Sequence, residues 1–382
     1  MISVVHVISG LEVGGAEIML ANLVSRSNPE RFRHVVVSLT TPGEIGPQIE
    51  AAGIRVEALG LARGRGLKLA GFFRLVRLLR RERPDLVQTW LYHGDLIGTV
   101  AALLARVPRI AWDVQCSTLE DRSAALKLIM RLLALGSRIP NAIIVNSVAG
   151  QEVHRRNGYR PRAWAQIANG VDTHAFTPRR AARDALRQAL GIPRDSFAIG
   201  LIARFHPMKD HRGFFAAAKI LAARRSDAMF VLAGSRTEAS AAIQAMIAAE
   251  GLAGRVISLG TRHDMASIYP ALDMVTLSSA YGEGCPNVLL EAMACGVPCV
   301  ATDVGDCARI IGDTGEVVQP RDPAALAAAW ERLAAKDAAQ LGAAARSRVE
   351  ALFALEHGLA QYEELYAGLV RNGVVSSAAE AR

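Results

Sequence analysis

The sequence predicts an α/β protein with two parallel-sheet domains, and three observations support this fold class. Short runs rich in Val, Ile and Ala alternate with longer helical segments along the chain, which is the rhythm of a doubly wound fold. The rhythm pauses at Asn169-Gly170, a turn signal that Pro178 follows, and then resumes. The 382 residues, 51% of them hydrophobic, suffice for two cores.

Each short apolar run between turn signals is expected to be a buried strand, and each longer amphipathic run a helix. The expected strands of the first sheet are residues 4–8, 34–39, 55–59, 86–89, 110–113 and 142–145. The expected strands of the second sheet are residues 198–203, 229–233, 256–259, 274–277 and 297–301. The expected helices of the first half are residues 17–25, 69–81, 96–105 and 126–135. A last long helix is expected over residues 356–369, before a small polar tail from Ser376.

Cysteine usage and apolar run lengths favour a cytoplasmic protein. The five cysteines include no C-x-x-C pair, as expected of reduced thiols. The N-terminus has no basic region or cleavage site, so we expect no signal peptide. No charge-free apolar run reaches about 18 residues, so we expect no transmembrane helix.

The positive charge lies in the first half of the chain. The net charge is +8, and residues 1–173 hold 22 Lys/Arg against 14 Asp/Glu, whereas the remaining residues hold 22 of each. Such asymmetry predicts an anionic partner for the first half: a membrane surface, a nucleic acid or an acidic substrate.

The strongest cationic run is residues 63–84, with eight Lys/Arg and one Glu. Apolar residues recur in it at helical spacing, so we expect an amphipathic helix whose apolar stripe packs on the sheet. The cations are expected to contact an anionic membrane, helped by a second cationic helix at residues 127–138. Nucleic acid is disfavoured as the partner because stacking aromatics do not interleave the cations.

The most informative stretch of the second half is Ser278–Asp303, where Glu283 and Glu291 stand eight positions apart. The segment Gly284–Val288 between them predicts a loop turning into a helix, since Pro286 suits a first helical turn. A helix N-terminus attracts anions, and carboxylates accept hydrogen bonds from sugar hydroxyls. The stretch therefore predicts a site for an anionic, polyhydroxylated ligand such as a nucleotide sugar.

Three further motifs follow expected strands, where ligands of open α/β sheets gather. Gly14 and Gly15 open a helix after the first strand, which lets a ligand approach the backbone. Arg204 and Lys209 stand five apart after the first strand of the second sheet, and two cations at this spacing can hold one pyrophosphate. His93 follows another strand and can hydrogen-bond a sugar or an acceptor hydroxyl.

Residues 283–305 resemble, almost position by position, the Glu-x7-Glu block of retaining glycosyltransferases of family 4. That family has the GT-B architecture, two Rossmann-like domains facing across a cleft. The resemblance implies transfer of a sugar, with retained anomeric configuration, from a nucleoside-diphosphate donor to an acceptor hydroxyl. It implies no metal or other cofactor, and an enzyme of the hexosyltransferase type.

The resemblance also implies roles for the motif residues. Arg204 and Lys209 would stabilise the leaving diphosphate, although the glycine that the family has after the lysine is replaced by Asp210. Glu283 would contact donor sugar hydroxyls, and Glu291 the ribose. The remaining expected donor-binding residues are Gly14, Gly15, Arg262, Gly284, Cys285, Pro286, Asn287 and Val288.

A catalytic histidine is less well indicated. Many relatives carry a histidine where this chain has Gln115 and Cys116, which leaves His93 as the candidate. The resemblance further implies a first domain over residues 1–170, a donor-binding domain over 171–355, and a C-terminal helix and tail over 356–382 that cross back to the first domain.

Family frequency favours UDP as the nucleotide. Charge and compartment favour a lipid-linked or cell-envelope glycan acceptor at the inner face of a bacterial cytoplasmic membrane. Two alternatives stay open: a nucleotide-sugar epimerase of the same architecture, and a non-catalytic glycan-binding protein. The donor sugar, the linkage and the oligomeric state do not follow from the sequence.

Overall fold

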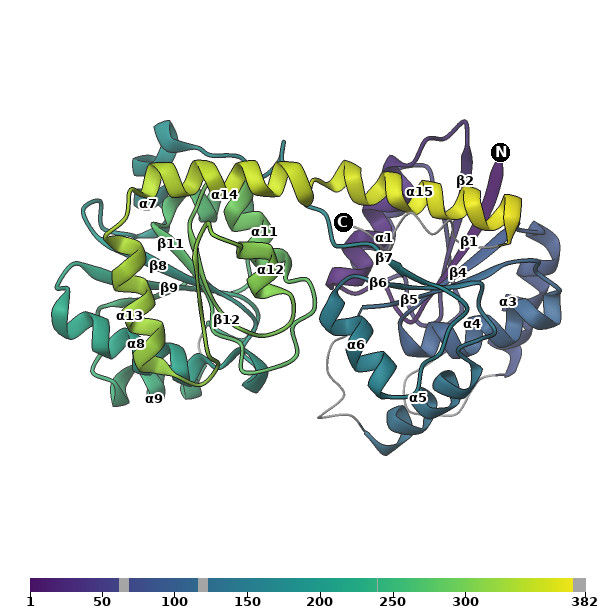
Figure 1. Ribbon diagram of the computed structural model, residues 1–382, viewed down its shortest axis with the longest axis horizontal. Coiled ribbons are helices and arrows are strands. Elements are labelled where there is room, and N and C mark those ends of the chain that lie inside the picture. The colour runs from purple at the N-terminus through teal and green to yellow at the C-terminus, as the bar shows by residue number, and fades with distance from the viewer. Residues whose placement is uncertain (62–68, 116–122, 239, 374–382) are drawn as a thin grey trace. The chain divides into compact units, whose positions relative to one another are not determined.

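The structure is a computed structural model that describes residues 1–61, 69–115, 123–238 and 240–373. It divides into two compact units. Unit 1 comprises Met1–Ala168 and the chain from His357 onwards, and unit 2 comprises Asn169–Glu356. Each unit is a parallel sheet with helices on both faces, which confirms the predicted α/β fold class (Figure 1).

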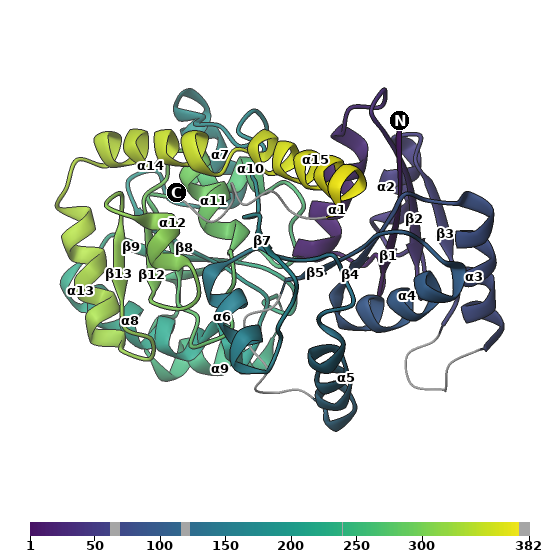
Figure 2. The same cartoon turned by 45° about the vertical axis from the view of Figure 1, so that its right-hand side comes forward.

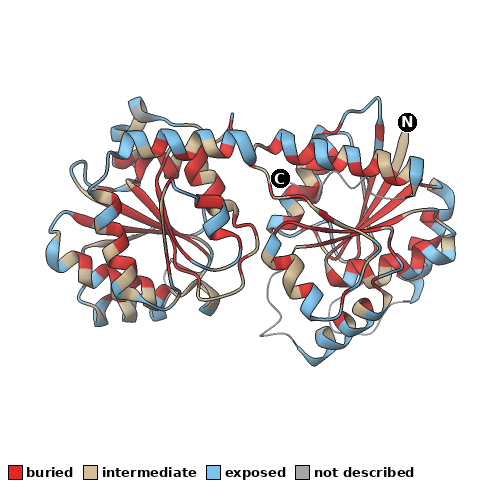
Figure 3. Ribbon diagram, in the orientation of Figure 1, coloured by how far each residue is buried: buried red, intermediate tan, exposed pale blue. Residues whose placement is uncertain are grey.

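Unit 1 is built on a sheet with the strand order β3-β2-β1-β4-β5-β6-β7, all parallel. The strands are β1 (Ile2–Ile8), β2 (Phe32–Ser38), β3 (Arg55–Ala58), β4 (Leu86–Trp90), β5 (Ile110–Val114), β6 (Ala142–Val145) and β7 (Trp164–Gln166). The central strands are buried on both faces (Figure 3), which explains why they are continuous apolar runs without alternation.

Helices cover both faces of this sheet (Figure 2). They are α1 (Gly15–Arg26), α2 (Gly46–Ala51), α3 (Leu69–Glu82), α4 (Leu91–Ala105), α5 (Ala124–Gly136), α6 (Val148–Arg156) and α15 (Leu355–Asn372). Helices α3, α4 and α5 share one apolar core with the strands. On the other face, the Tyr362 hydroxyl of α15 donates to Asp113 Oδ2 at 2.6 Å, and Tyr366 donates to Gln88. The C-terminal helix is thus fixed to unit 1 by buried hydrogen bonds.

Unit 2 has a parallel sheet in the order β10-β9-β8-β11-β12-β13. The strands are β8 (Phe197–Ile202), β9 (Ala228–Ala233), β10 (Val256–Ser258), β11 (Met274–Leu277), β12 (Cys299–Thr302) and β13 (Glu316–Val318). The longer helices are α7 (Arg183–Leu190), α8 (His211–Arg224), α9 (Ala241–Ala249), α11 (Asn287–Ala294), α13 (Pro323–Ala334) and α14 (Ala338–Leu352). The short ones are η1 (Arg180–Ala182), η2 (Pro207–Lys209), α10 (Met265–Ile268), η3 (Tyr269–Ala271) and α12 (Cys307–Ile311). Phe214, Phe230 and Trp330 join α8, the sheet and α13 in one apolar core.

The eleven predicted strands are all present, with ends shifted by up to two residues. Strand β12 begins at Cys299 rather than Val297, because Pro298 has no N–H to give to the ladder. Strands β7 and β13 are not predicted from the sequence. Both are edge strands of three residues, too short for a period-two pattern.

The basic segment folds partly as predicted. Its described part, α3, buries a stripe that includes Leu75, Val76 and Leu79 against the sheet. Its arginines at positions 74, 77, 80 and 81 are exposed. The start of the segment at residues 62–68, Cys116 and the tail from Ser376 lie outside the described residues. Within the described ranges no helix combines the length and apolarity needed to span a membrane.

Candidate functional site

The strand order of unit 2 reverses direction between β8 and β11, so the chain leaves these neighbouring strands toward opposite sides. The loops after two such strands form the usual binding crevice of an open α/β sheet. The loop after β8 carries Arg204 and Lys209, and the loop after β11 carries Glu283. The fold therefore places the predicted cations and the first predicted carboxylate at its topological switch point.

Lys209 and Glu283 are in direct contact there. The Lys209 Nζ lies 2.5 Å from Glu283 Oε1, and the side chains are only 15% and 7% exposed. Ser279 donates a hydrogen bond to the same carboxylate oxygen. A buried ammonium needs a counter-ion, because leaving it unpaired in a region of low dielectric costs several kcal/mol. Glu283 supplies that counter-ion in this structure.

Hydrogen bonds to backbone carbonyls join the two loops. The Ser278 hydroxyl donates to the Lys209 carbonyl at 2.8 Å, and the Ala280 amide donates to the Met208 carbonyl at 2.8 Å. The Lys209–Glu283 pair is consequently held by main-chain contacts as well as by its own attraction.

Asp210, the departure from the family pattern, has a clear structural explanation. Its backbone is left-handed, with φ of +44°, a conformation that glycine adopts freely and that Asp and Asn tolerate better than other residues. Its carboxylate accepts a hydrogen bond from the Gly213 amide at 3.0 Å and so caps α8. The replacement therefore keeps the turn and adds a helix cap.

The other predicted cations of unit 2 are not brought into this contact. Arg204 is exposed and forms no ion pair within the part of the chain that the structure describes. Arg262 follows the edge strand β10, is exposed, and pairs with Asp264, whose Oδ1 lies 2.8 Å from its Nε. Both lie on loops at the carboxyl edge of the sheet.

The loop Gly284–Val288 leads into α11 as predicted, with Pro286 at the N-cap and Asn287 as the first helical residue. Cys285 is buried, and burial raises the pKa of its thiol to about 12. The side-chain amide of Asn169 donates to the Cys285 carbonyl at 3.1 Å and to Asn287 Oδ1 at 2.9 Å. Asn169 therefore positions the start of α11.

Gly305 supports the same loop from the end of β12. Its backbone is left-handed, with φ of +65°, and a Cβ at this position would lie 2.3 Å from the Glu283 carbonyl oxygen. The neighbouring Asp306 amide donates to the Gly284 carbonyl at 3.0 Å. Only glycine permits this close approach.

Glu291 lies on α11, where its Oε2 accepts a hydrogen bond from the Tyr269 hydroxyl at 2.7 Å. Burial raises the pKa of this carboxyl from an ordinary value of 4.5 to about 7, while the Tyr269 hydrogen bond acts in the opposite direction. The carboxylate faces a phenol donor, and it would have to accept ribose hydroxyls beside or instead of that donor.

The predicted residues of unit 1 also lie at a switch point, between β1 and β4. Gly14 is the N-cap of α1 and Gly15 its first residue, after β1. His93 is exposed in the first turn of α4, after β4. The Gly94 amide lies 3.3 Å from the Ser9 hydroxyl, which links the two loops. Gln115 follows β5.

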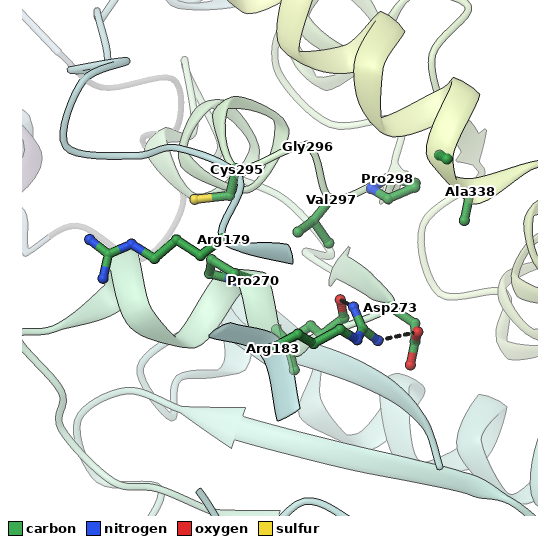
Figure 4. A pocket seen from close by; sticks show the side chains of 11 residues that line it. Arg179, Arg183, Pro270, Asp273, Cys295, Gly296, Val297, Pro298 and Ala338 are labelled. Atoms are coloured by element: carbon green, nitrogen blue, oxygen red, sulfur yellow. Dashed lines mark hydrogen bonds and ion pairs between the residues drawn. The ribbon is translucent and has the colours of Figure 1, made fainter. Parts of the chain in front are cut away.

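Two cavities of unit 2 lie at opposite ends of the sheet's strands. One of about 280 Å³, shown in Figure 4, includes Arg183, Asp273 and Pro298 in its lining. Asp273 and Pro298 directly precede β11 and β12, so this cavity lies at the amino ends of the strands. The other, of about 360 Å³, includes Asp210 and Tyr281 in its lining, at the carboxyl ends of β8 and β11. The second cavity adjoins the loops that carry the Lys209–Glu283 pair.

Sequence reasoning missed the side chains that position the predicted ones. Ser279, two residues after β11, has no signal that sets it apart from the rest of the motif. Asn169 is predicted as a turn residue of the linker, and its amide contact 118 positions away has no local signal. Nothing in the sequence joins Tyr269 to Glu291.

Two family models match the chain. The model described as Glycosyltransferase Family 4 matches residues 13–175, and the model described as Glycosyl transferases group 1 matches residues 196–336. Each match falls largely within one of the two sheet-bearing parts described above.

Curated relatives and solved structures agree with these matches. A UDP-Gal:alpha-D-GlcNAc-diphosphoundecaprenol alpha-1,3-galactosyltransferase of Escherichia coli is 28% identical over 235 residues, 60% of each chain. The Rhizobium meliloti lipopolysaccharide core biosynthesis mannosyltransferase LpsB is 26% identical over 86% of this chain and 93% of its own length. Among solved structures, Anabaena Alr3699/HepE in complex with UDP matches with a TM-score of 0.85 at 22% identity, covering 96% of this chain and 100% of its own.

The chain thus spans about 60% of the length of the Escherichia coli relative. With the two Rossmann-like sheets, these matches support a glycosyltransferase of GT-B architecture. The resemblance stated from the sequence is confirmed at this level.

Proposed function

We propose that the protein is a retaining hexosyltransferase of family 4 that moves a sugar from a UDP-sugar to a hydroxyl of a lipid-linked or other cell-envelope glycan. The observation that carries the proposal is the Lys209–Glu283 pair at the β8/β11 switch point, next to the start of α11. A cation, a carboxylate and a helix N-terminus together suit a sugar diphosphate.

The relatives support the choice of ligands. The same Anabaena protein is also described in complex with UDP-glucose, at a TM-score of 0.84. The name of the Escherichia coli relative gives a UDP-galactose donor and a diphosphoundecaprenol-linked acceptor. We extend both classes, a UDP-sugar and a lipid-linked glycan, to this chain.

The chemistry follows from charge. As the bond between sugar and diphosphate breaks, negative charge develops on the β-phosphate, and Lys209 with Arg204 would stabilise it. Glu283 would exchange part of its contact with Lys209 for hydroxyls of the donor sugar, and amides of residues 284–288 would face the same group. Glu291 would bind the ribose and Arg262 the base, and Gly14 and Gly15 would contact the donor.

A front-face route accounts for retention. The acceptor hydroxyl attacks from the side on which the diphosphate leaves, and a phosphate oxygen takes its proton. His93 is our candidate for binding the acceptor or the reacting sugar. We propose that no metal or other cofactor takes part, because the cationic side chains supply the charge stabilisation.

The place of action follows from the acceptor. A lipid-linked acceptor requires contact with the inner face of the cytoplasmic membrane, and the exposed arginines of α3 support contact with anionic lipid. Among the alternatives, an epimerase would isomerise the donor without an acceptor, and a glycan-binding protein would tolerate loss of Lys209.

A donor screen followed by product analysis tests the proposal. UDP- and GDP-sugars are compared by ligand-induced thermal stabilisation, and we expect UDP-sugars to raise the melting temperature more. With the best donor and an acceptor glycan, NMR of the product is expected to show an α-linkage from an α-donor. An inverted linkage would refute retention, and isomerised donor without transfer would favour the epimerase.

A further inference from the structure

Helix α5 of unit 1 carries apolar residues on two faces. On its inner face Met130 and Leu133 are buried in the core. On its outer face Leu128, Leu132 and Leu135 are 58%, 48% and 85% exposed, at a spacing of four and three residues. Ile139, just after the helix, is 43% exposed. Soluble proteins rarely leave such a continuous apolar row uncovered, and α5 lies at the periphery of its unit (Figure 2).

Cations accompany this outer row. Residues three or four apart share a helix face, so Arg131 lies beside Leu135, and Lys127 lies one turn before Arg131. Arg138 follows directly after the C-cap of α5. No Asp or Glu occurs in residues 123–151. The charges that α5 itself carries beside the apolar row are all positive, which suits a partner that is both apolar and anionic.

A cavity of about 640 Å³ opens at the C-terminal end of α5. Its charged lining residues are Glu152, Arg138, Arg155, Arg156 and Arg160. Glu152 accepts a hydrogen bond from Arg156 Nε at 2.8 Å. Arg138 and Arg155 form no ion pair among the residues that the structure describes. The cavity therefore keeps excess positive charge, and arginine matches the geometry of phosphate oxygens.

The cavity and the helix are tied together. The Arg160 amide donates to the Ser137 hydroxyl at 2.8 Å, and Arg162 Nε donates to the Arg138 carbonyl at 2.9 Å. The Arg160 guanidinium is held by the carbonyls of Arg155 and Tyr159, at 2.7 and 2.8 Å. These bonds fix the Arg160 side chain and the backbone of Arg138 at the end of α5.

We propose that α5 and this arginine cavity dock on a bilayer containing anionic phospholipid. The outer leucines enter the boundary between head groups and acyl chains, and Arg138 and Arg155 bind the phosphodiester of a head group. The proposal deepens the proposed function, since it names the surface that would bring the enzyme to a lipid-linked acceptor.

Vesicle co-sedimentation of the full chain, without donor or acceptor, tests this proposal apart from glycosyl transfer. The vesicles are phosphatidylcholine alone or mixed with phosphatidylglycerol, at low and high salt. We expect binding to the mixed vesicles at low salt. Leu132→Gln with Leu135→Gln should weaken it by about tenfold, because two exposed apolar side chains lose their membrane contact. Arg138→Gln with Arg155→Gln should weaken it by about tenfold at low salt only.

The control is Leu352→Gln on α14, because Leu352 is 54% exposed in unit 2. It should leave vesicle binding unchanged, and circular dichroism should show the same unfolding temperature for all variants. Wild-type affinity of either double variant for mixed vesicles would overturn the proposal. The proposal would also be refuted if the leucine variant changed only the oligomeric state, from dimer to monomer. It would equally be refuted if the arginine variant lost only the binding of inorganic phosphate.

Discussion

The carboxyl edges of the two sheets differ in how their loops are held. In unit 2 the loops after β8, β11 and β12 are joined by hydrogen bonds such as Ala280 N to Met208 O and Asp306 N to Gly284 O. In unit 1 buried polar groups at the same edge bond inward: Asp113 accepts from Tyr362, and Asp95 accepts from Thr89 at 2.6 Å. The unit 2 edge directs a carboxylate at a cation of a neighbouring loop, whereas the unit 1 edge uses its carboxylates to hold α4 and α15.

This difference predicts which substitutions lower turnover most. Residues of a preorganised site lose function when a single contact is removed, since nothing replaces the contact at the moment of reaction. Exposed residues of the unit 1 edge, such as His93, contribute to turnover only through contacts that form when a substrate binds. Substitutions on the two edges should therefore have effects of different size.

The largest effect is expected at Lys209. Lys209→Ala should lower kcat by about 10²–10³, because it removes the cation held where the leaving diphosphate gains charge. His93→Ala on the other edge should cost about tenfold or less, because it removes one hydrogen bond to a neutral hydroxyl. Steady-state kinetics with the best donor measures both, and Lys209→Arg should recover part of the rate. Equal losses of kcat at Lys209 and His93 would contradict the expected difference between the two edges.

The next effect concerns the support of the Glu283 loop. Gly305→Ala should lower stability by several kcal/mol and weaken donor binding, because it adds left-handed strain and a contact of 2.3 Å with the Glu283 carbonyl. Gly53→Ala is the matched control: φ at Gly53 is +81°, and a Cβ there has nothing within 4 Å. It should cost only about 1 kcal/mol in urea unfolding. If the two alanines cost the same, the loop does not depend on this contact.

A smaller effect should appear in the pH dependence of stability. Because burial raises the pKa of Glu291 to about 7, the folded state keeps a proton that the unfolded state has released between about pH 4.5 and 7. The Glu291 contribution to stability should therefore fall as pH rises through that window, and Glu291→Gln should remove this contribution. Asp113, whose pKa burial raises to about 7, acts in the same direction. His34, His154 and His211, whose pKa burial lowers to about 4, act in the opposite direction, so the variant is compared with the wild type at each pH. Urea midpoints at several pH values measure the difference, and an unchanged slope would contradict the assignment.

Much of the fold and part of the site could be predicted from the sequence. Buried parallel strands are continuous apolar runs, so eleven of them were visible, while the three-residue strands β7 and β13 carry too little pattern. The motif placed Glu283 and Lys209 at strand ends. It did not show that Glu283 is the counter-ion of Lys209, because a contact across 74 positions depends on strand order. The arginine cavity beside α5 was likewise not predictable, because it depends on a hydrogen bond between the Arg160 amide and the Ser137 hydroxyl, which are not neighbours in the sequence.

We propose that the Lys209 ammonium contacts the diphosphate of the donor. Isothermal titration of the full chain with UDP and UMP tests it most directly, with wild type and Lys209→Ala side by side. The wild type should bind UDP about tenfold or more tightly than UMP, and the substitution should remove most of that preference, since it deletes the charge facing the second phosphate. An undiminished preference for UDP in the Lys209→Ala protein would contradict the claim.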